Sequence, residues 1–154
     1  MLNETLLVNK ADFTDLTYYK GELPDLADGH IRVDVGPWAL TANNVTYMVS
    51  GDQIGYWGFF APKAYGIEPT GVPSTDLGRM PVWGYATVSE NRCEGVNVGD
   101  EIYGFFPIAK HFDMQPGKVS AAGFHDAAAH RQDLHSLYSG YTFINSDPSF
   151  ALHT

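Results

Sequence analysis

The segment that begins at His30 restricts the fold of this chain most directly. It reads H-I-R-V-D-V, and its apolar residues Ile31, Val33 and Val35 alternate with polar ones. A period of two places alternate side chains on opposite faces of an extended chain, which is typical of a half-buried β-strand. We therefore predict a strand over residues 30–35.

Glycine, proline and aromatic residues are spread along the whole chain. Its 154 residues include 16 glycines and 9 prolines, and 14% are aromatic. This composition favours short strands joined by tight turns over a helix bundle. Hydrophobic residues make up 44%, enough to bury one substantial core. Without an internal repeat or a linker, we predict one mostly β domain over residues 1–154.

Several further elements are expected. Residues 4–8 and 15–20 are predicted to form an opening hairpin or two edge strands. After residues 36–37, Thr41, Asn43 or Asn44 is predicted to cap a helix of about two turns that Gly51 ends. Residues 52–80 are rich in glycine, proline and rings without periodicity, which indicates a long loop packed by its own rings.

The second half of the chain is expected to supply two strand pairs. Residues 82–89 and 96–106 are predicted to be strands joined through a glycine-rich corner. A further pair is predicted in residues 108–115 and 118–126, with a turn at residues 115–117. Beyond Ala127 the pattern is weakly helical.

The charge of the chain disfavours several classes of partner. Eighteen acidic and nine basic residues give a net charge of -9, which opposes binding to nucleic acid or anionic membrane surfaces. The first residues lack the features of a signal peptide, and no stretch approaches the ~18 apolar residues of a membrane span. The lone Cys93 excludes an internal disulfide framework and a multi-thiolate zinc site. We expect a cytoplasmic protein.

Three segments follow one another in a characteristic order. Residues 27–52 contain the alternating strand, an Asn-containing turn and a short helix ending in Ser-Gly. Residues 80–104 contain a proline, a strand glycine and V-N-V-G-D-E-I-Y-G, and residues 123–131 begin with a Gly-aromatic strand. Together, over about residues 26–131, they resemble the N-terminal GroES-like catalytic domain of the medium-chain dehydrogenase/reductase superfamily. The resemblance implies a partly open β-barrel with one or two short helices.

The chain departs from the zinc-dependent members of that superfamily. They use a cysteine in the Asn-containing turn and a Gly-His-Glu in the second segment, where this chain has W-A-L-T at 38–41 and W-G-Y-A at 83–86. Zinc catalysis of that type therefore lacks its ligands. The resemblance is to zinc-free quinone oxidoreductases and enoyl reductases, which implies NADPH as reductant and a small apolar carbonyl substrate.

The dinucleotide-binding half of such reductases is missing from the sequence. No G-x-G-x-x-G occurs, and residues 149–154 form an apolar ending. We expect this chain to be a piece of a longer reductase-like protein, or a barrel that lost its Rossmann domain, and to bind no NADPH alone. Whether it is an enzyme stays open. The alternative is a stand-alone interaction module that forms homo-oligomers through an exposed apolar barrel face.

The resemblance assigns catalytic roles to the turn and the helix after the alternating strand. In zinc-free relatives an asparagine in this turn and a nearby tyrosine or threonine face the nicotinamide and the substrate carbonyl. A phenol can donate a hydrogen bond to a developing enolate, and an amide can hold the cofactor carboxamide. The candidates are Tyr47, Asn44, Asn43 and Thr46. Helix capping and core packing are the competing interpretation.

Large rings offer a candidate substrate cleft. Trp38, Tyr56, Trp57, Phe59 and Phe60 could line an apolar surface for a quinone or an acyl chain, or could fasten the long loop to the barrel. A metal site is not expected. Histidines and aspartates gather in residues 125–135, but residues five apart share no face of a helix or a strand. This segment favours a barrel-closing strand followed by a solvated turn.

Overall fold

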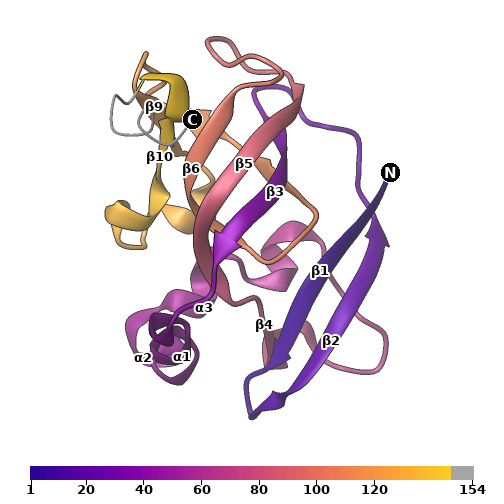
Figure 1. Ribbon diagram of the computed structural model, residues 1–154. Helices are drawn as coiled ribbons and strands as arrows, with labels where there is room; N and C mark the ends of the chain where they lie inside the picture. The colour runs from indigo at the N-terminus through magenta and orange to yellow at the C-terminus, as the bar shows by residue number, and fades with distance from the viewer. Residues whose placement is uncertain (147–154) are drawn as a thin grey trace.

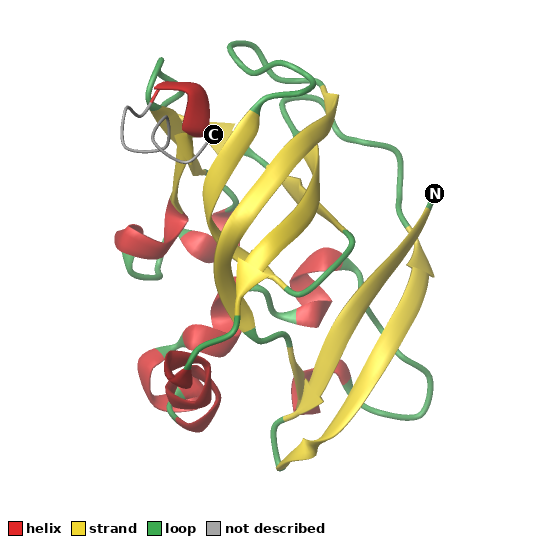
Figure 2. Ribbon diagram, in the orientation of Figure 1, coloured by secondary structure: helices red, strands yellow, loops and turns green. Residues whose placement is uncertain are grey.

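A computed structural model describes residues 1–146 of the chain (Figures 1 and 2), and the apolar ending at residues 149–154 lies outside this part. The strands are β1 Leu2–Asn9, β2 Asp12–Glu22, β3 Ile31–Ala39, β4 Leu77–Gly78, β5 Pro81–Asn91, β6 Glu101–Pro107, β7 His111–Met114, β8 Pro116–Gly117, β9 Gly123–Asp126 and β10 Gly140–Phe143. The helices are α1 Ala42–Val49, α2 Gly51–Ile54, α3 Tyr56–Phe59 and the 3-10 turns η1 Pro62–Tyr65, η2 Ser74–Asp76, η3 Ala129–Arg131, η4 Ser136–Ser139 and η5 Ile144–Ser146.

Seven strands form one curled sheet in the order β7-β3-β5-β6-β10-β9-β8. The long strands β3, β5 and β6 pair antiparallel at its centre, and the sheet makes a nearly closed barrel. The prediction of a mostly β, partly open barrel is confirmed, as are the predicted strands of β5 and β6. The barrel is consistent with a GroES-like fold, with three short α-helices in the described residues where one or two were expected.

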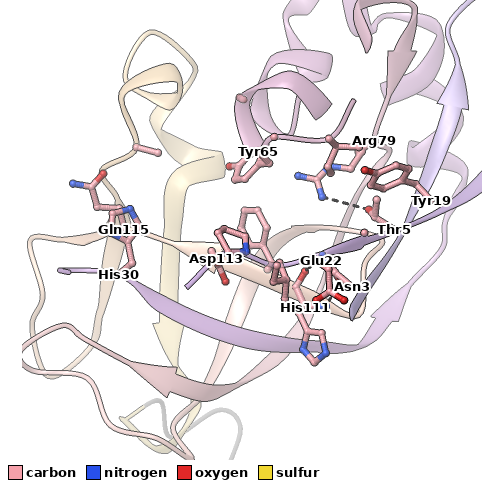
Figure 3. Close-up of a pocket in the computed structure, with 18 of the residues that line it drawn as sticks. Asn3, Thr5, Tyr19, Glu22, His30, Tyr65, Arg79, His111, Asp113 and Gln115 are labelled. Carbon is pink, nitrogen blue, oxygen red and sulfur yellow. Dashed lines mark hydrogen bonds between the residues drawn. The ribbon is translucent and has the colours of Figure 1, made fainter. Parts of the chain in front are cut away.

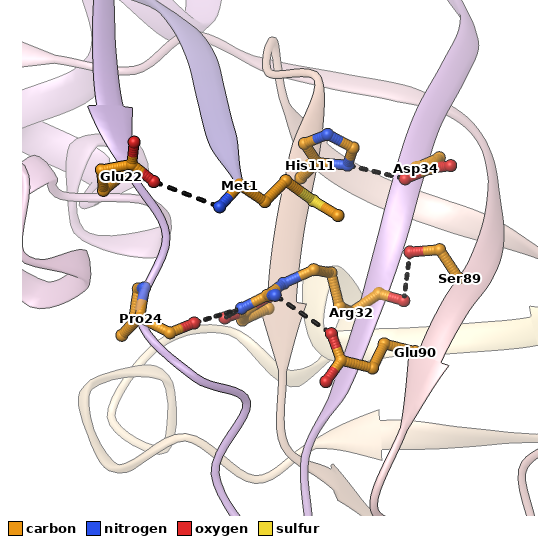
Figure 4. A network of polar contacts seen from close by, with 9 residues as sticks. Met1, Glu22, Pro24, Arg32, Asp34, Ser89, Glu90 and His111 are labelled. Carbon is orange, nitrogen blue, oxygen red and sulfur yellow. Dashed lines mark hydrogen bonds and ion pairs between the residues drawn. The ribbon is translucent and has the colours of Figure 1, made fainter.

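The alternating strand is confirmed as β3, with one exception to its pattern. Ile31 and Val33 are fully buried, but Arg32 is only 4% exposed although the alternation places it outside. Its guanidinium lies between two neighbouring strands (Figure 4), donating from Nε to Asp113 at 2.7 Å and from Nη1 to Glu90 at 3.1 Å. Carboxylates on β7 and β5 thus stabilise a buried charge.

The N-terminal hairpin forms a second, three-stranded sheet. β1 and β2 pair antiparallel, as the sequence predicts, and β4 pairs with the other edge of β1. Two backbone hydrogen bonds fasten β1 to the barrel, from Leu6 N to Ile108 O at 2.9 Å and from Lys110 N to Glu4 O at 2.8 Å. The hairpin therefore lies against the barrel as a flap joined along one side (Figure 1).

The predicted long loop at residues 52–80 is wrong in its local structure. The segment contains α2, α3, two 3-10 turns and β4. Gly55 ends α2 and Gly66 ends η1, with positive φ values of 75° and 69°. Residues with a side chain rarely adopt this backbone conformation, so glycine suits both positions. The segment is thus a series of one-turn helices, which are too short to show a helical period in the sequence.

The predicted pairing of residues 108–115 with residues 118–126 is also wrong. β7 pairs with β3, whereas β9 pairs with β10 and β8. The Pro116–Gly117 dipeptide forms β8 instead of the predicted turn. The pairing of β7 with β3 buries Phe112 and Met114 in the main core. Because this burial depends on contacts between residues far apart in the sequence, the turn residues at 115–117 could not predict it.

The barrel interior is mainly aromatic. Phe105 and Phe106 of β6 are fully buried and pack with rings from α3, β7 and β10. Tyr141 crosses β6 at Gly104, where a Cβ atom would overlap its ring, and its hydroxyl donates to Phe105 O at 2.5 Å. Within residues 1–146, no helix has the length and apolar character to cross a membrane.

Candidate functional site

Helix α1 begins as the sequence predicts, with Thr41 as its N-cap residue. Asn44, in the first turn, is only 3% exposed. Its Oδ1 accepts from Thr41 N at 2.7 Å, and its Nδ2 donates to Pro81 O at 2.8 Å. The amide therefore fastens the start of α1 to β5, and both of its ends are occupied by the backbone.

Tyr47 lies one turn later on the inner face of the same helix. It is 8% exposed, and its ring packs against Tyr56 and Phe105 with centroids 4.5 and 5.7 Å away. The indole Nε1 of Trp83 donates to the Tyr47 hydroxyl at 3.3 Å. Because the hydroxyl accepts this bond, its own proton stays available for donation to another group.

A second phenol pair lies beside Tyr47. The hydroxyls of Tyr56 and Tyr138 are 3.0 Å apart and both side chains are half-buried. The hydrogen bond with Tyr56, followed by burial, raises the pKa of Tyr138 to about 12. The Tyr138 phenol therefore remains a neutral donor or acceptor near neutral pH.

These rings form one group, which we call the aromatic cluster. Its members come from α1, the start of α3, β5, β6 and η4, and the ring centroids of Trp83 and Phe105 lie 5.1 Å apart. Three hydroxyls and one indole N–H are embedded among the rings. Tyr56, Trp83 and Tyr138 are partly exposed, so these three members offer a ring surface with oriented polar groups, whereas Phe105 and Tyr47 are buried behind them. The cluster consists of Tyr47, Tyr56, Trp83, Phe105 and Tyr138.

The other predicted site residues lie elsewhere. Asn43 and Thr46 are exposed on the outer side of α1, and Trp38 at the end of β3 is 40% exposed. Phe59 and Phe60 are buried in the main core. Of the five rings predicted to line a cleft, Tyr56 belongs to the aromatic cluster, and Phe59 packs directly against Tyr56, Phe105 and Tyr138 of that cluster.

Trp57 belongs to a different core. It packs on Phe13 and on a small cluster under the N-terminal hairpin, and it is 5% exposed. A Cβ atom at Gly51 or Gly78 would overlap its indole ring. Trp57 therefore fastens α2 and α3 to β4. The sequence had left open whether this ring lines a cleft or fastens its segment to the rest of the fold, and the structure shows a fastening role.

Sequence reasoning missed three members of the cluster: Trp83, Phe105 and Tyr138. Phe105 lies within the predicted strand over residues 96–106. The sequence places Trp83 in a predicted strand. Tyr85, two residues later, is also aromatic and lies on the same face of that strand, so the local pattern does not single out Trp83 as a site residue. Tyr138 lies in η4, after the segment where periodicity ends. Trp83 contacts Tyr47 at a separation of 36 residues, and Tyr138 contacts Tyr56 at a separation of 82 residues, so only the tertiary structure brings them together.

The histidine-rich segment at residues 125–135 does not gather ligands. Across residues 1–146, no three side chains of His, Cys, Asp or Glu lie close enough to hold a metal ion. Asp126 instead pairs with the buried guanidinium of Arg131 at 2.8 Å. The segment comprises β9 followed by η3, in keeping with the predicted barrel-closing strand.

The fold and the cluster define a class, a mostly antiparallel β-barrel domain with an aromatic, phenol-bearing group beside its short helices. Within that class, the chain belongs to the family described as "Protein of unknown function (DUF2855)", whose model matches residues 38–154. No curated protein matches the sequence.

Solved structures give a second comparison, in which 25 chains match. One is the crystal structure of human synaptic vesicle membrane protein VAT-1 homolog-like protein. It is similar with a TM-score of 0.41 and 13% sequence identity over 75% of this chain and 33% of that chain. The present chain therefore spans about a third of that protein's length.

Proposed function

We propose that this chain is the substrate domain of a zinc-independent, NADPH-dependent reductase-like protein that acts on a quinone, an enone or an enoyl compound. The order of the three sequence segments and the barrel with its short helices support the assignment to this fold class. On this proposal the chain is inactive alone, because residues 1–146 contain no dinucleotide-binding βαβ unit.

The observation that carries the proposal is the hydrogen bond from Trp83 to Tyr47. The indole occupies an acceptor site of the hydroxyl at 3.3 Å, so the hydroxyl proton can be offered to a carbonyl oxygen on which negative charge develops. The surrounding rings supply the apolar wall that such a substrate needs. Tyr47 is therefore the proposed donor, and the flanking rings are the proposed substrate contacts.

Residues 1–146 do not fit a dinucleotide. The strand pairs in this part of the chain are all antiparallel, so the parallel βαβ unit that cradles a diphosphate is lacking. The amide of Asn44 is held by two backbone groups, with Oδ1 accepting from Thr41 N and one N–H of Nδ2 donating to Pro81 O, and the side chain is only 3% exposed, so it is poorly placed to hold a cofactor carboxamide. Asn43 and Thr46 are exposed on α1 and remain candidates for contact with a cofactor held by a separate domain.

The three tryptophans offer a direct test of substrate binding. In an 15N-labelled chain each indole N–H gives its own NMR signal, and Trp83, Trp57 and Trp38 lie in the cluster, in a separate core and at the surface. We expect menadione, a quinone, to shift the Trp83 signal saturably and to leave that of Trp57 in place. Trp83→Phe assigns the signal.

Two results would contradict the proposal. Equal shifts of the Trp57 and Trp83 signals, or no shift at all, would remove the substrate role of the cluster. Oxidation of NADPH by menadione in the presence of this chain alone would refute its dependence on a separate cofactor domain.

A second candidate function is a stand-alone interaction module. One observation favours it: exposed apolar side chains gather around α1, where Val45 and Val49 are 56% and 66% exposed and share one helix face. Leu40 just before the helix is 64% exposed. Sedimentation analysis at rising concentration tests this, because a dimer that Val49→Glu dissociates is expected for the module and a monomer throughout for the reductase domain.

A further inference from the structure

A cavity of about 410 Å³ lies between the N-terminal hairpin and the barrel. Its walls come from β1, β2, the turn η1 and β7, and Figure 3 shows their side chains converging on one space. Much of the lining is apolar or aromatic, with Tyr19, Leu23, Tyr65, Ile67 and Phe112 among its members. None of the aromatic cluster lines it, so this cavity is separate from the site proposed above.

One wall of the cavity contains a buried cation, Arg79, which is 1% exposed. Its Nε donates to Phe60 O at 2.9 Å and its Nη1 to Thr5 Oγ1 at 3.3 Å. Its Nη2 has no hydrogen-bond partner within residues 1–146. The ring of Tyr65 lies 4.8 Å from the guanidinium carbon, which stabilises the charge only in part.

Arg79 differs from the two other buried arginines. Arg32 pairs with Asp113 at 2.7 Å, and Arg131 pairs with Asp126 at 2.8 Å. In the described residues Arg79 has no carboxylate partner. A buried charge without a counter-ion is costly, and neutral hydrogen bonds and rings offset that cost incompletely. Burial lowers the pKa of Arg79 to about 10, so the guanidinium still carries its charge at neutral pH.

The other charged groups around the cavity are already engaged. Asp113 is held by Arg32, His111 Nδ1 lies 2.6 Å from Asp34, and Glu22 binds the N-terminal amine at 3.1 Å. Two of these three lining side chains are carboxylates, and the chain carries a net charge of -9. This setting opposes a polyanion and leaves a single uncompensated positive charge, which suits a ligand with one negative charge.

From this arrangement we propose that the cavity binds a small organic monocarboxylate, with its carboxylate against Arg79 and its apolar body between the rings of Tyr19, Tyr65 and Phe112. A planar carboxylate can take the hydrogen of Nη2 in a charge-assisted bond. The volume is within the usual range for small-molecule sites. The proposal goes beyond the reductase assignment and does not depend on it.

Binding of phenylacetate to the full chain tests the proposal, measured by calorimetry at neutral pH. Phenylethanol has a similar shape without the charge, and inorganic phosphate has the charge without the apolar body. We expect saturable binding of phenylacetate and affinities at least about tenfold weaker for the other two probes, because each lacks one half of the recognition.

Two variants locate the site. Arg79→Met keeps the length of the side chain and removes its charge, and Ala64→Trp places a large ring at an exposed lining position while leaving Arg79 intact. Both are expected to weaken phenylacetate binding at least about tenfold. Arg92→Met is the matched control, since Arg92 is an exposed arginine outside the cavity.

Each result of these binding measurements either supports or overturns the proposed monocarboxylate site. Absence of phenylacetate binding, equal binding of phenylethanol, or unchanged binding by folded Arg79→Met would each overturn the proposal and would mark Arg79 as a structural residue only. Should Arg79→Met fail to fold, as judged by circular dichroism, Ala64→Trp and the comparison of acid with alcohol decide the matter. None of these outcomes bears on menadione and Trp83.

Discussion

The guanidinium of Arg131 donates to the carboxylate of Asp126 at 2.8 Å, and both side chains are closed to solvent. The same guanidinium donates to the Tyr141 hydroxyl at 2.9 Å and to Tyr138 O at 2.6 Å. This ion pair thus ties η3 to β9, β10 and η4. It fixes the segment that presents Tyr138 to the aromatic cluster.

Loss of the Asp126 charge should destabilise the barrel strongly. Asp126→Asn leaves a buried guanidinium without its counter-ion, which is expected to cost about 3 to 5 kcal/mol of unfolding free energy. Urea denaturation measures the change. Asp133→Asn, at an exposed position nearby, is the control and should stay within about 0.5 kcal/mol of the wild type. A small effect at Asp126 would mean that the pair contributes little.

The contact of Trp57 with two glycines should be intolerant of added volume. Gly78→Ala introduces a methyl group that overlaps the indole, so we expect a loss of about 1 to 3 kcal/mol in stability. Gly140→Ala is the matched control, because a Cβ atom there meets its nearest neighbour at an ordinary 3.6 Å. Similar melting temperatures for the two variants would contradict this packing.

Tyr47→Phe and Tyr47→Ala should differ in kind. Tyr47→Phe removes the acceptor of the Trp83 indole and keeps the ring, so we expect a shift of the Trp83 N–H signal with a stability loss of about 1 kcal/mol. Tyr47→Ala leaves a cavity beside Tyr56 and Phe105 and should cost about 3 kcal/mol or more. An unmoved Trp83 signal in Tyr47→Phe would show that the hydrogen bond is not formed in solution.

The phenol pair predicts the behaviour of the protein at high pH. The pKa of Tyr138 is about 12 in the folded chain, raised first by its hydrogen bond with Tyr56, against an ordinary value of 10.0. Because the folded state holds this proton more tightly than the unfolded chain, stability should fall as pH rises from about 10 to 12. Tyr56→Phe should lower the pKa of Tyr138, as followed by ultraviolet absorbance. An unchanged titration would exclude the hydrogen bond as its cause.

Local patterns in the sequence were enough to predict most of the strands and one helix boundary, but not β4, β8 and β10. The alternation after His30 identified β3, and the runs on either side of residues 90–95 identified β5 and β6. Thr41, the N-cap of α1, was one of the three residues expected to cap this helix. Each of these signals arises within one element, because period and capping depend on near neighbours. The mostly β class followed from them and from the turn residues spread along the chain.

Pairing and site geometry required the tertiary structure. The hydrophobic pattern of residues 111–114 is equally compatible with several partners, and the burial of Phe112 beside β3 selects one of them. Arg32 is buried against the alternation because two carboxylates, both far away in the sequence, stabilise its charge. Arg79 is buried without a carboxylate partner among residues 1–146. Sequence determines which side chains are present and on which local face. Only the folded chain decides which charges meet a partner, since that depends on contacts between residues far apart along the chain.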